Sequence, residues 1–116
     1  MKCNYCGGET QIVKGAKLYP YHPDIGEKLF YYCACQPAWV GCHKNTDKPM
    51  GTLANSELRN LRREVHRQMD KFWQNGKMTR GQCYARMSKM LNVSHFHIGQ
   101  CSVEQCYSAL KKLESW

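Results

Sequence analysis

The clearest periodic pattern in the chain is a stripe of apolar residues between residues 55 and 73, with spacings of three and four. Its members are Leu58, Leu61, Val65, Met69 and Phe72. These spacings place the side chains on one face of an α-helix. Asn55 is suited to cap the N-terminus, with Glu57 in the first turn, and Gln74-Asn75-Gly76 is typical of a helix C-terminus. We therefore predict a helix over about 55–73.

Two capping boxes predict two more helices in the C-terminal half. Thr79-x-x-Gln82 opens a helix over about 80–91, and Ser102-x-x-Gln105 opens another over about 103–113. The side chains expected to face inward are Tyr84, Met87, Met90, Leu91, Cys106, Leu110 and Leu113. The stretch between these helices, residues 92–101, has no regular period.

The N-terminal residues have the pattern of short strands separated by loops. Thr10–Val13, Leu29–Tyr32 and the pair Trp39-Val40 are rich in strand-forming residues. Residues 19–24 contain two prolines and predict a loop. Residues 46–54, with Lys48-Pro49 and Gly51, predict a turn-rich linker that no helix can cross.

Cysteines then suggest what holds the N-terminal part together. Cys3-x-x-Cys6 and Cys33-x-Cys35 flank 26 residues, which is the arrangement of a zinc ribbon. Four thiolates complete the coordination of one Zn²⁺ per chain, so such a site is structural rather than catalytic. Because the second pair has a single intervening residue, Cys42 or His43 is the natural substitute ligand. A disulfide framework and unmetallated thiols are the alternatives.

These patterns together predict an α+β fold in three parts. Residues 1–45 form an N-terminal cysteine zinc ribbon of short β-hairpins, and residues 46–54 form the linker turn. Residues 55–116 form a three-helix region on which the ribbon packs.

Charge changes the picture of the helical region. The chain carries 17 Lys and Arg against nine Asp and Glu, a formal net charge of +8, of which residues 55–116 hold +6. The first predicted helix repeats a basic residue every four positions, with one further arginine on its flank, and this stripe comprises Arg59, Arg63, Arg67, Lys71 and the flanking Arg62. A stripe of this kind suits phosphate contacts. The alternative is a solvated helix face, on which Glu64 and Asp70 offset part of the charge.

A second metal site is possible near the last two helices. Its candidate ligands are Cys83, His95, His97, Cys101 and Cys106. The spacing matches no familiar finger, and cysteines on apolar helix faces are commonly buried thiols, so both interpretations stay open.

Enzyme motifs and membrane segments are not recognisable in the sequence. It has no His-Glu-x-x-His, no Gly-x-Ser-x-Gly and no phosphate-binding glycine loop. No apolar run approaches the length of a membrane span, and no secretory signal pattern precedes Cys3. We therefore expect a non-enzymatic intracellular protein.

The chain resembles a family of small bacteriophage and prophage proteins, a zinc-finger-containing domain of unknown function. The resemblance is carried by Cys3-Asn-Tyr-Cys-Gly and by the segment from Trp39-Val-Gly-Cys-His43 to Gly51-Thr-Leu-Ala54. It continues at Leu58-Arg59, Arg62-Arg63, His66, Asp70, Trp73 and His97-Ile98-Gly99. It implies a phage origin, hence the cytoplasm of a bacterial host, and a zinc site at Cys3, Cys6, Cys33 and Cys35. The single-residue gap before Cys35 and the extra Cys42 depart from the family pattern.

Three functional hypotheses follow. The favoured one is a zinc-binding phage-type accessory protein that binds nucleic acid through the basic helix, with Tyr19 and Tyr21 available to stack on bases. The second is a zinc-stabilised protein–protein module that inhibits or modulates a host or defence enzyme. The third is a zinc-dependent hydrolase, in which His43 or His97 would lie beside an open metal position.

Overall fold

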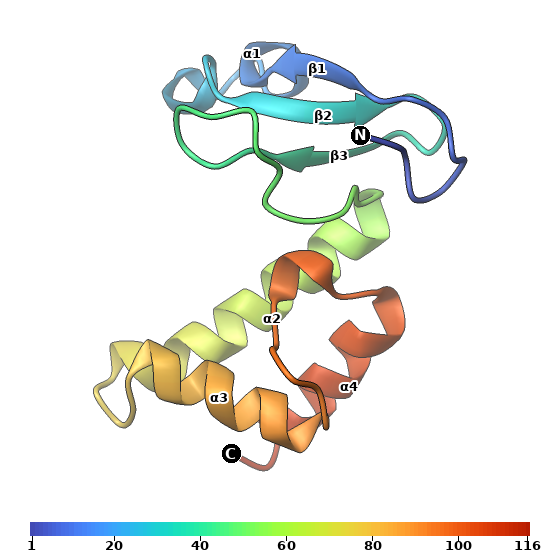
Figure 1. The fold of residues 1–116 in the computed structure, drawn as a ribbon. Helices are drawn as coiled ribbons and strands as arrows, with labels where there is room; N and C mark the ends of the chain where they lie inside the picture. Colours follow the sequence, from blue (N-terminus) through green and yellow to red (C-terminus); the bar gives the residue numbers. More distant parts are fainter. The chain divides into compact units, whose positions relative to one another are not determined.

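The computed structural model describes all residues from 1 to 116, and the chain divides into two compact units. The first unit is Met1–Ser56 and the second is Glu57–Trp116. The β-sheet belongs to the first unit, and the three longest helices are α2, α3 and α4, in the C-terminal half (Figure 1). The predicted α+β class is confirmed.

The first unit is built on a three-stranded antiparallel sheet. Its strands are β1 (Gln11–Lys14), β2 (Leu29–Cys33) and β3 (Ala38–Gly41), in the order β1-β2-β3. In the register of the sheet, Tyr31 lies opposite Ile12 on one side and Val40 on the other. Each strand lies within one or two residues of the stretch that predicted it.

The connection from β1 to β2 contains two short helical turns, α1 (Gly15–Leu18) and η1 (Pro23–Ile25). The predicted proline-broken loop is therefore partly ordered as a 3₁₀ turn. Gly15 is needed where these turns meet, because a Cβ at this position would lie only 1.9 Å from the carbonyl oxygen of Ile25. No side chain fits there without a shift of the backbone.

Both faces of the sheet bury side chains. Cys3, Ala38, Val40 and Leu53 form a small core, and Tyr5, Tyr31 and Cys33 pack against it. Alternation along the strands sends Phe30, Tyr32 and Trp39 to the opposite face. There Phe30 is buried, and Trp39 Nε1 donates a 2.9 Å hydrogen bond to the Tyr19 hydroxyl. This partnership orients Tyr19 toward the protein, while Tyr21 is 91% exposed.

Residues 46–54, predicted to be a linker turn, lie within the first unit and hydrogen bond to β3. Trp39 and Ala54 exchange two backbone hydrogen bonds of 3.1 Å, and Met50 N donates to Gly41 O at 2.9 Å. The Asn4 side chain closes a further pair, accepting from Leu53 N and donating to Leu53 O. These bonds and the burial of Leu53 make the segment part of the folded unit.

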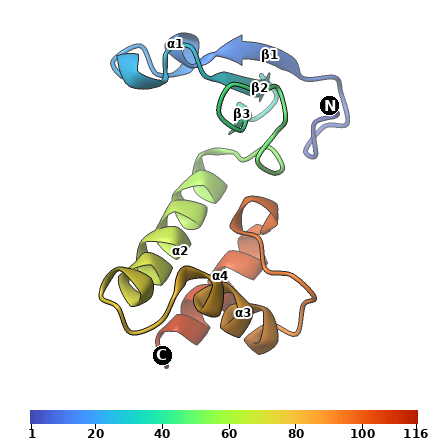
Figure 2. The same cartoon turned by 60° about the vertical axis from the view of Figure 1, so that its left-hand side comes forward.

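The second unit contains α2 (Ser56–Gln74), whose first residue closes the first unit, and then α3 (Arg80–Met90), η2 (Ile98–Gln100) and α4 (Val103–Leu113). The bounds of all three helices lie within one residue of those predicted. Both capping boxes form: Thr79 Oγ1 accepts from Gln82 N, and Ser102 Oγ accepts from Gln105 N. α3 and α4 pack against each other (Figures 1 and 2).

Apolar side chains of all three helices fill the second unit. Those with no exposed surface are Val65, Met69, Cys83, Met87, Cys106 and Ala109. The C-terminal residue joins two of the helices: the Trp116 ring packs edge-on against Phe72, and its Nε1 donates to Met90 Sδ at 2.8 Å. No helix combines the length and apolar character that crossing a bilayer requires.

Candidate metal centre

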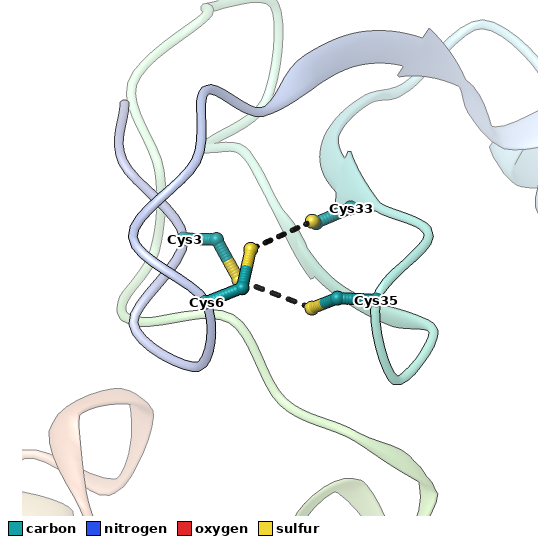
Figure 3. Close-up of side chains that lie close together, drawn as sticks. All are labelled: Cys3, Cys6, Cys33 and Cys35. Carbon is teal, nitrogen blue, oxygen red and sulfur yellow. Dashed lines mark hydrogen bonds between the residues drawn. The ribbon is translucent and has the colours of Figure 1, made fainter.

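Four cysteines converge at one end of the sheet (Figure 3). Cys3 and Cys6 come from the loop that precedes β1, whereas Cys33 ends β2 and Cys35 lies in the turn toward β3. The side chains of the two pairs point toward one another, and a dashed line in the figure joins each member of one pair to a member of the other. The short second knuckle therefore brings both of its sulfur atoms to the cluster.

The spacing of the sulfur atoms fits a metal ion rather than disulfides. Cys3 Sγ lies 3.5 Å from Cys35 Sγ, and Cys6 Sγ lies 3.6 Å from Cys33 Sγ. All four sulfur atoms are within 4.8 Å of one another. Tetrahedral Zn²⁺ with bonds of about 2.3 Å needs sulfur atoms about 3.8 Å apart, whereas a disulfide needs about 2.0 Å. The cluster fits one zinc ion.

The first knuckle also supplies amides to its sulfur atoms. Tyr5 N donates to Cys3 Sγ and Gly8 N donates to Cys6 Sγ, each at 3.4 Å. Gly7 makes this turn with a φ of +76°, which a side chain would disfavour. Such hydrogen bonds stabilise thiolates, so the loop is shaped for ionised sulfur.

The titration behaviour of the thiols shows what a cation contributes. Burial acts to raise the pKa of Cys3, but hydrogen bonds from the Cys6 and Tyr5 amides and from neighbouring thiols outweigh it and lower the pKa to about 7. Desolvation and hydrogen bonds with Cys33, Cys3 and Cys6 raise the pKa of Cys35 to about 12. One thiolate thus opposes ionisation of the next, and a divalent cation removes that repulsion.

Cys42 and His43, the substitute ligands, do not join the cluster. Cys42 has no exposed surface. Burial is the largest cause that raises the pKa of its thiol, and the charge of Asp47 raises it further. His43 is exposed, and its backbone carbonyl accepts from Thr46. The cysteine set is complete without them, so the centre has no open position supplied by an adjacent histidine.

The possible second metal site is not assembled. The set at the ribbon is the one group of three or more possible ligands in the structure. His95 and His97 are exposed, with ring centroids 6.4 Å apart. Cys83, Cys101 and Cys106 are buried, and Cys101 Sγ contacts the His97 carbonyl at 3.5 Å. A hydrogen bond with Cys106, then burial, raises the pKa of Cys101, which favours its neutral thiol.

The predicted basic stripe on α2 is partly exposed. Arg63, Arg67 and Lys71 are exposed, whereas Arg59 is half-buried and already engaged in an interaction. Arg67 makes a two-point ion pair with Glu64, at 3.0 Å from Nε and 2.6 Å from Nη2. Hydrogen bonds from Arg67 and then Gln68 lower the pKa of Glu64 to about 2. The stripe is therefore narrower and less charged than the sequence suggests.

Arg62 does not belong to the exposed stripe, which corrects its predicted role. The residue is 9% exposed, and its Nε and Nη2 donate to the Cys101 carbonyl at 3.1 and 2.8 Å. A signal for this was present in the sequence, because Arg62 follows Leu58 by four residues and precedes Val65 by three. It therefore falls within the apolar stripe and links α2 to the residue before the α4 cap.

Comparison with known families agrees with the metal centre. A family model described as a zinc-finger-containing domain, of unknown function, matches residues 1–115. No curated protein and no solved structure matches the chain significantly.

Proposed function

The chain belongs to this family of zinc-finger-containing domains, and we propose that it is an accessory protein that binds nucleic acid through the exposed basic residues of α2. The zinc centre has a structural part in this proposal, because four cysteine ligands leave no coordination position for a substrate. The surface that carries the binding is therefore sought in the second unit.

The observation that carries the proposal is the row formed by Arg63, Arg67 and Lys71. The three residues are exposed and occur every four positions along one helix. Successive members are about 6 Å apart along the helix axis, and each presents hydrogen-bond donors. A row of like charges destabilises an isolated helix slightly, and a polyanion placed along it would remove that cost.

The charge of the whole second unit supports the same surface. Residues 57–116 contain eleven Lys and Arg against five Asp and Glu. Positive charge on this scale attracts nucleic acid over distances of about 10 Å at moderate salt. Contacts to phosphates alone give affinity without base preference, so the proposal is for binding with little sequence specificity.

Glu64 gives the proposal an internal test. Its carboxylate accepts two hydrogen bonds from the guanidinium of Arg67, so a phosphate must displace this carboxylate to bind that side chain. Replacing Glu64 with glutamine weakens this competition and removes one negative charge from the surface. We expect Glu64→Gln to bind nucleic acid several-fold more tightly than the parent protein.

The main experiment compares two charge-removed variants of equal net charge. Arg63→Gln/Lys71→Gln removes two cations of the row, and Lys111→Gln/Lys112→Gln removes two exposed lysines near the end of α4. Fluorescence anisotropy of the zinc-loaded proteins with labelled single- and double-stranded DNA and RNA is measured over a range of salt. For duplex DNA, log of the binding constant falls as log of the salt concentration rises. The magnitude of this negative slope should be smaller by about 2 in the α2 variant.

The Lys111→Gln/Lys112→Gln control shows whether a loss of affinity is specific to the α2 row. If both variants lose affinity equally, the binding reflects net charge and the proposal fails. If neither variant differs from the parent, the row is a solvated helix face, and co-purification should be used to seek a protein partner instead.

A further inference from the structure

The second unit contains a cavity that neither the metal centre nor the basic row of α2 accounts for. Its volume is about 360 Å³. Residues from α2, from the start of α3 and from the segment around η2 line it. Its polar side chains are His66, Arg80, His95 and His97, and its aromatic ones are Tyr84 and Phe96.

The lining is cationic and lacks a carboxylate. Arg80 and Gly81 are the first residues of α3, so the positive end of that helix dipole also lies at the cavity. The Arg80 guanidinium lies 5.4 Å from the centroid of the Tyr84 ring, a contact that leaves its charge unneutralised. Tyr84 in turn packs edge-on against the buried Phe96. A cation beside an apolar wall suits a ligand that is anionic at one end and flat at the other.

The pKa of His66 depends on the charges around the cavity. Desolvation is the largest influence on the pKa of His66 and lowers it. The Asp70 carboxylate raises this pKa, whereas the charges of Arg80 and His97 lower it further. An anion bound among these groups would counter the repulsion from Arg80 and His97. Its binding would therefore raise the pKa of His66 and be favoured as pH falls toward that pKa.

We propose that this cavity binds a nucleoside monophosphate, with the phosphate among Arg80, His66 and His97 and the base toward Tyr84. The volume lies in the range of small-molecule sites and exceeds what a phosphate alone would fill. A phosphate monoester carries nearly two negative charges at neutral pH, more than a diester in the middle of a chain. The ligand is thus a free mononucleotide or the phosphorylated end of a nucleic acid. The inference goes beyond the function proposed above, because it uses none of the three cations of the α2 row.

The experiment titrates the full-length zinc-loaded protein with AMP, adenosine and inorganic phosphate, followed by NMR of backbone amides and histidine rings. AMP should bind at least tenfold more tightly than adenosine, and it should shift Gly81, Gly99 and the His66 ring. The pKa of His66 should rise when AMP is bound. Equal affinity for AMP and adenosine, or shifts elsewhere on the surface, would overturn the assignment.

Arg80 and Arg86 form a matched pair of variants. Both are exposed on α3, and each guanidinium lies over an aromatic ring, at 5.4 Å from Tyr84 and 4.7 Å from Trp116 respectively. Only Arg80 lines the cavity. Arg80→Gln should weaken AMP binding at least tenfold, and Arg86→Gln should leave it within twofold. His97→Gln provides a second cavity variant in case Arg80→Gln perturbs folding, and equal losses in the Arg80 and Arg86 variants would refute the site.

Two oligonucleotides distinguish the sources of the phosphate. They share one sequence, and one has a 5′-phosphate whereas the other has a 5′-hydroxyl. A preference for the phosphorylated end that disappears in Arg80→Gln identifies a nucleic-acid terminus, and AMP binding without that preference identifies a free nucleotide. Because AMP binding is measured separately, it can persist if Arg63→Gln/Lys71→Gln shows the α2 row to be inactive, so the two proposals can fail independently.

Discussion

In the first unit four of the five cysteines converge on one point, whereas in the second unit all three cysteines are buried in the protein interior. The residue type is the same, and the backbone around it differs. In the first unit the cysteines stand in pairs on tight turns that direct sulfur atoms and amides to a common centre. In the second they lie on helices or beside a helix cap, where a thiol behaves as a small apolar group.

The two units also differ in the source of their stability. The buried cluster of the first unit consists of Cys3, Ala38, Val40 and Leu53, which supply little apolar area. The second unit buries longer side chains, such as Met69 and Met87, and fixes two helix ends with complete capping boxes. We infer that the stability of the first unit depends on the ion and that of the second on packing.

Loss of the ion should produce the largest effect and separate the two units most clearly. Cys35→Ser, or chelation of the parent protein, should unfold the first unit, because structural zinc sites contribute on the order of 10 kcal/mol to folding. Zinc analysis and NMR of the sheet amides measure this, while circular dichroism at 222 nm should show that the helices persist. Cys42→Ala is the control and should retain one zinc per chain. Simultaneous loss of sheet and helices would show that the units do not fold separately.

A core truncation in the second unit should have the opposite pattern. Met87 has no exposed surface, and Met87→Ala should lower the free energy of unfolding of the helices by about 2–5 kcal/mol. Zinc content should stay unchanged. Met50, which is 39% exposed, provides the matched control, and Met50→Ala should change stability by less than about 0.5 kcal/mol. Urea unfolding followed at 222 nm gives the value for Met87→Ala, and NMR of the sheet amides during urea unfolding gives the value for Met50→Ala, which lies in the first unit.

The neighbours Arg62 and Arg63 sharpen the distinction between packing and surface within one helix. Arg62→Met should cost about 1–3 kcal/mol, because it leaves the Cys101 carbonyl without its donors. Arg63→Met should leave stability within about 0.5 kcal/mol. Thermal and urea unfolding of the two variants provide the comparison. Equal costs at both positions would mean that the hydrogen bonds of Arg62 add nothing to the stability of the unit.

The capping boxes should give the smallest effect. Thr79→Ala and Ser102→Ala each remove the side-chain acceptor for an amide in the first helical turn, at a cost of about 1 kcal/mol. Because the helices belong to the second unit, zinc binding should not change. Thr79→Ser and Ser102→Thr keep the hydroxyl and should remain close to the parent protein in urea unfolding.

Local patterns explain why much of this architecture could be predicted from the sequence. The paired cysteines, the capping boxes and the apolar stripe of α2 each reside within a short stretch, so spacing alone reveals them. The same logic predicts the strands, since short runs of strand-forming residues, such as Leu29–Tyr32 directly before Cys33, reveal them.

Contacts between distant residues could not be read in this way. The charge of Arg62 predicts a surface position and its place in the apolar stripe predicts burial, and the partner that decides between them, Cys101, lies 39 residues away. The local sequence around Leu53 predicts a linker, whereas its backbone hydrogen bonds to the Asn4 side chain, 49 residues away. The cavity gathers residues from two helices and a loop, and no single stretch of sequence brings His66, Arg80 and His97 together.

The uneven burial of the metal centre has a consequence for the durability of the fold. Cys3 is 3% exposed, whereas Cys6 and Cys35 face solvent. Oxidants and competing chelators therefore reach the centre from one side, and zinc-bound thiolates remain reactive there. Damage to either exposed sulfur atom releases the ion and, with it, the fold of 56 residues. We therefore expect the stability of the first unit to depend on zinc supply and on reducing conditions, and that of the helical unit, which holds no such cluster, to depend on them less.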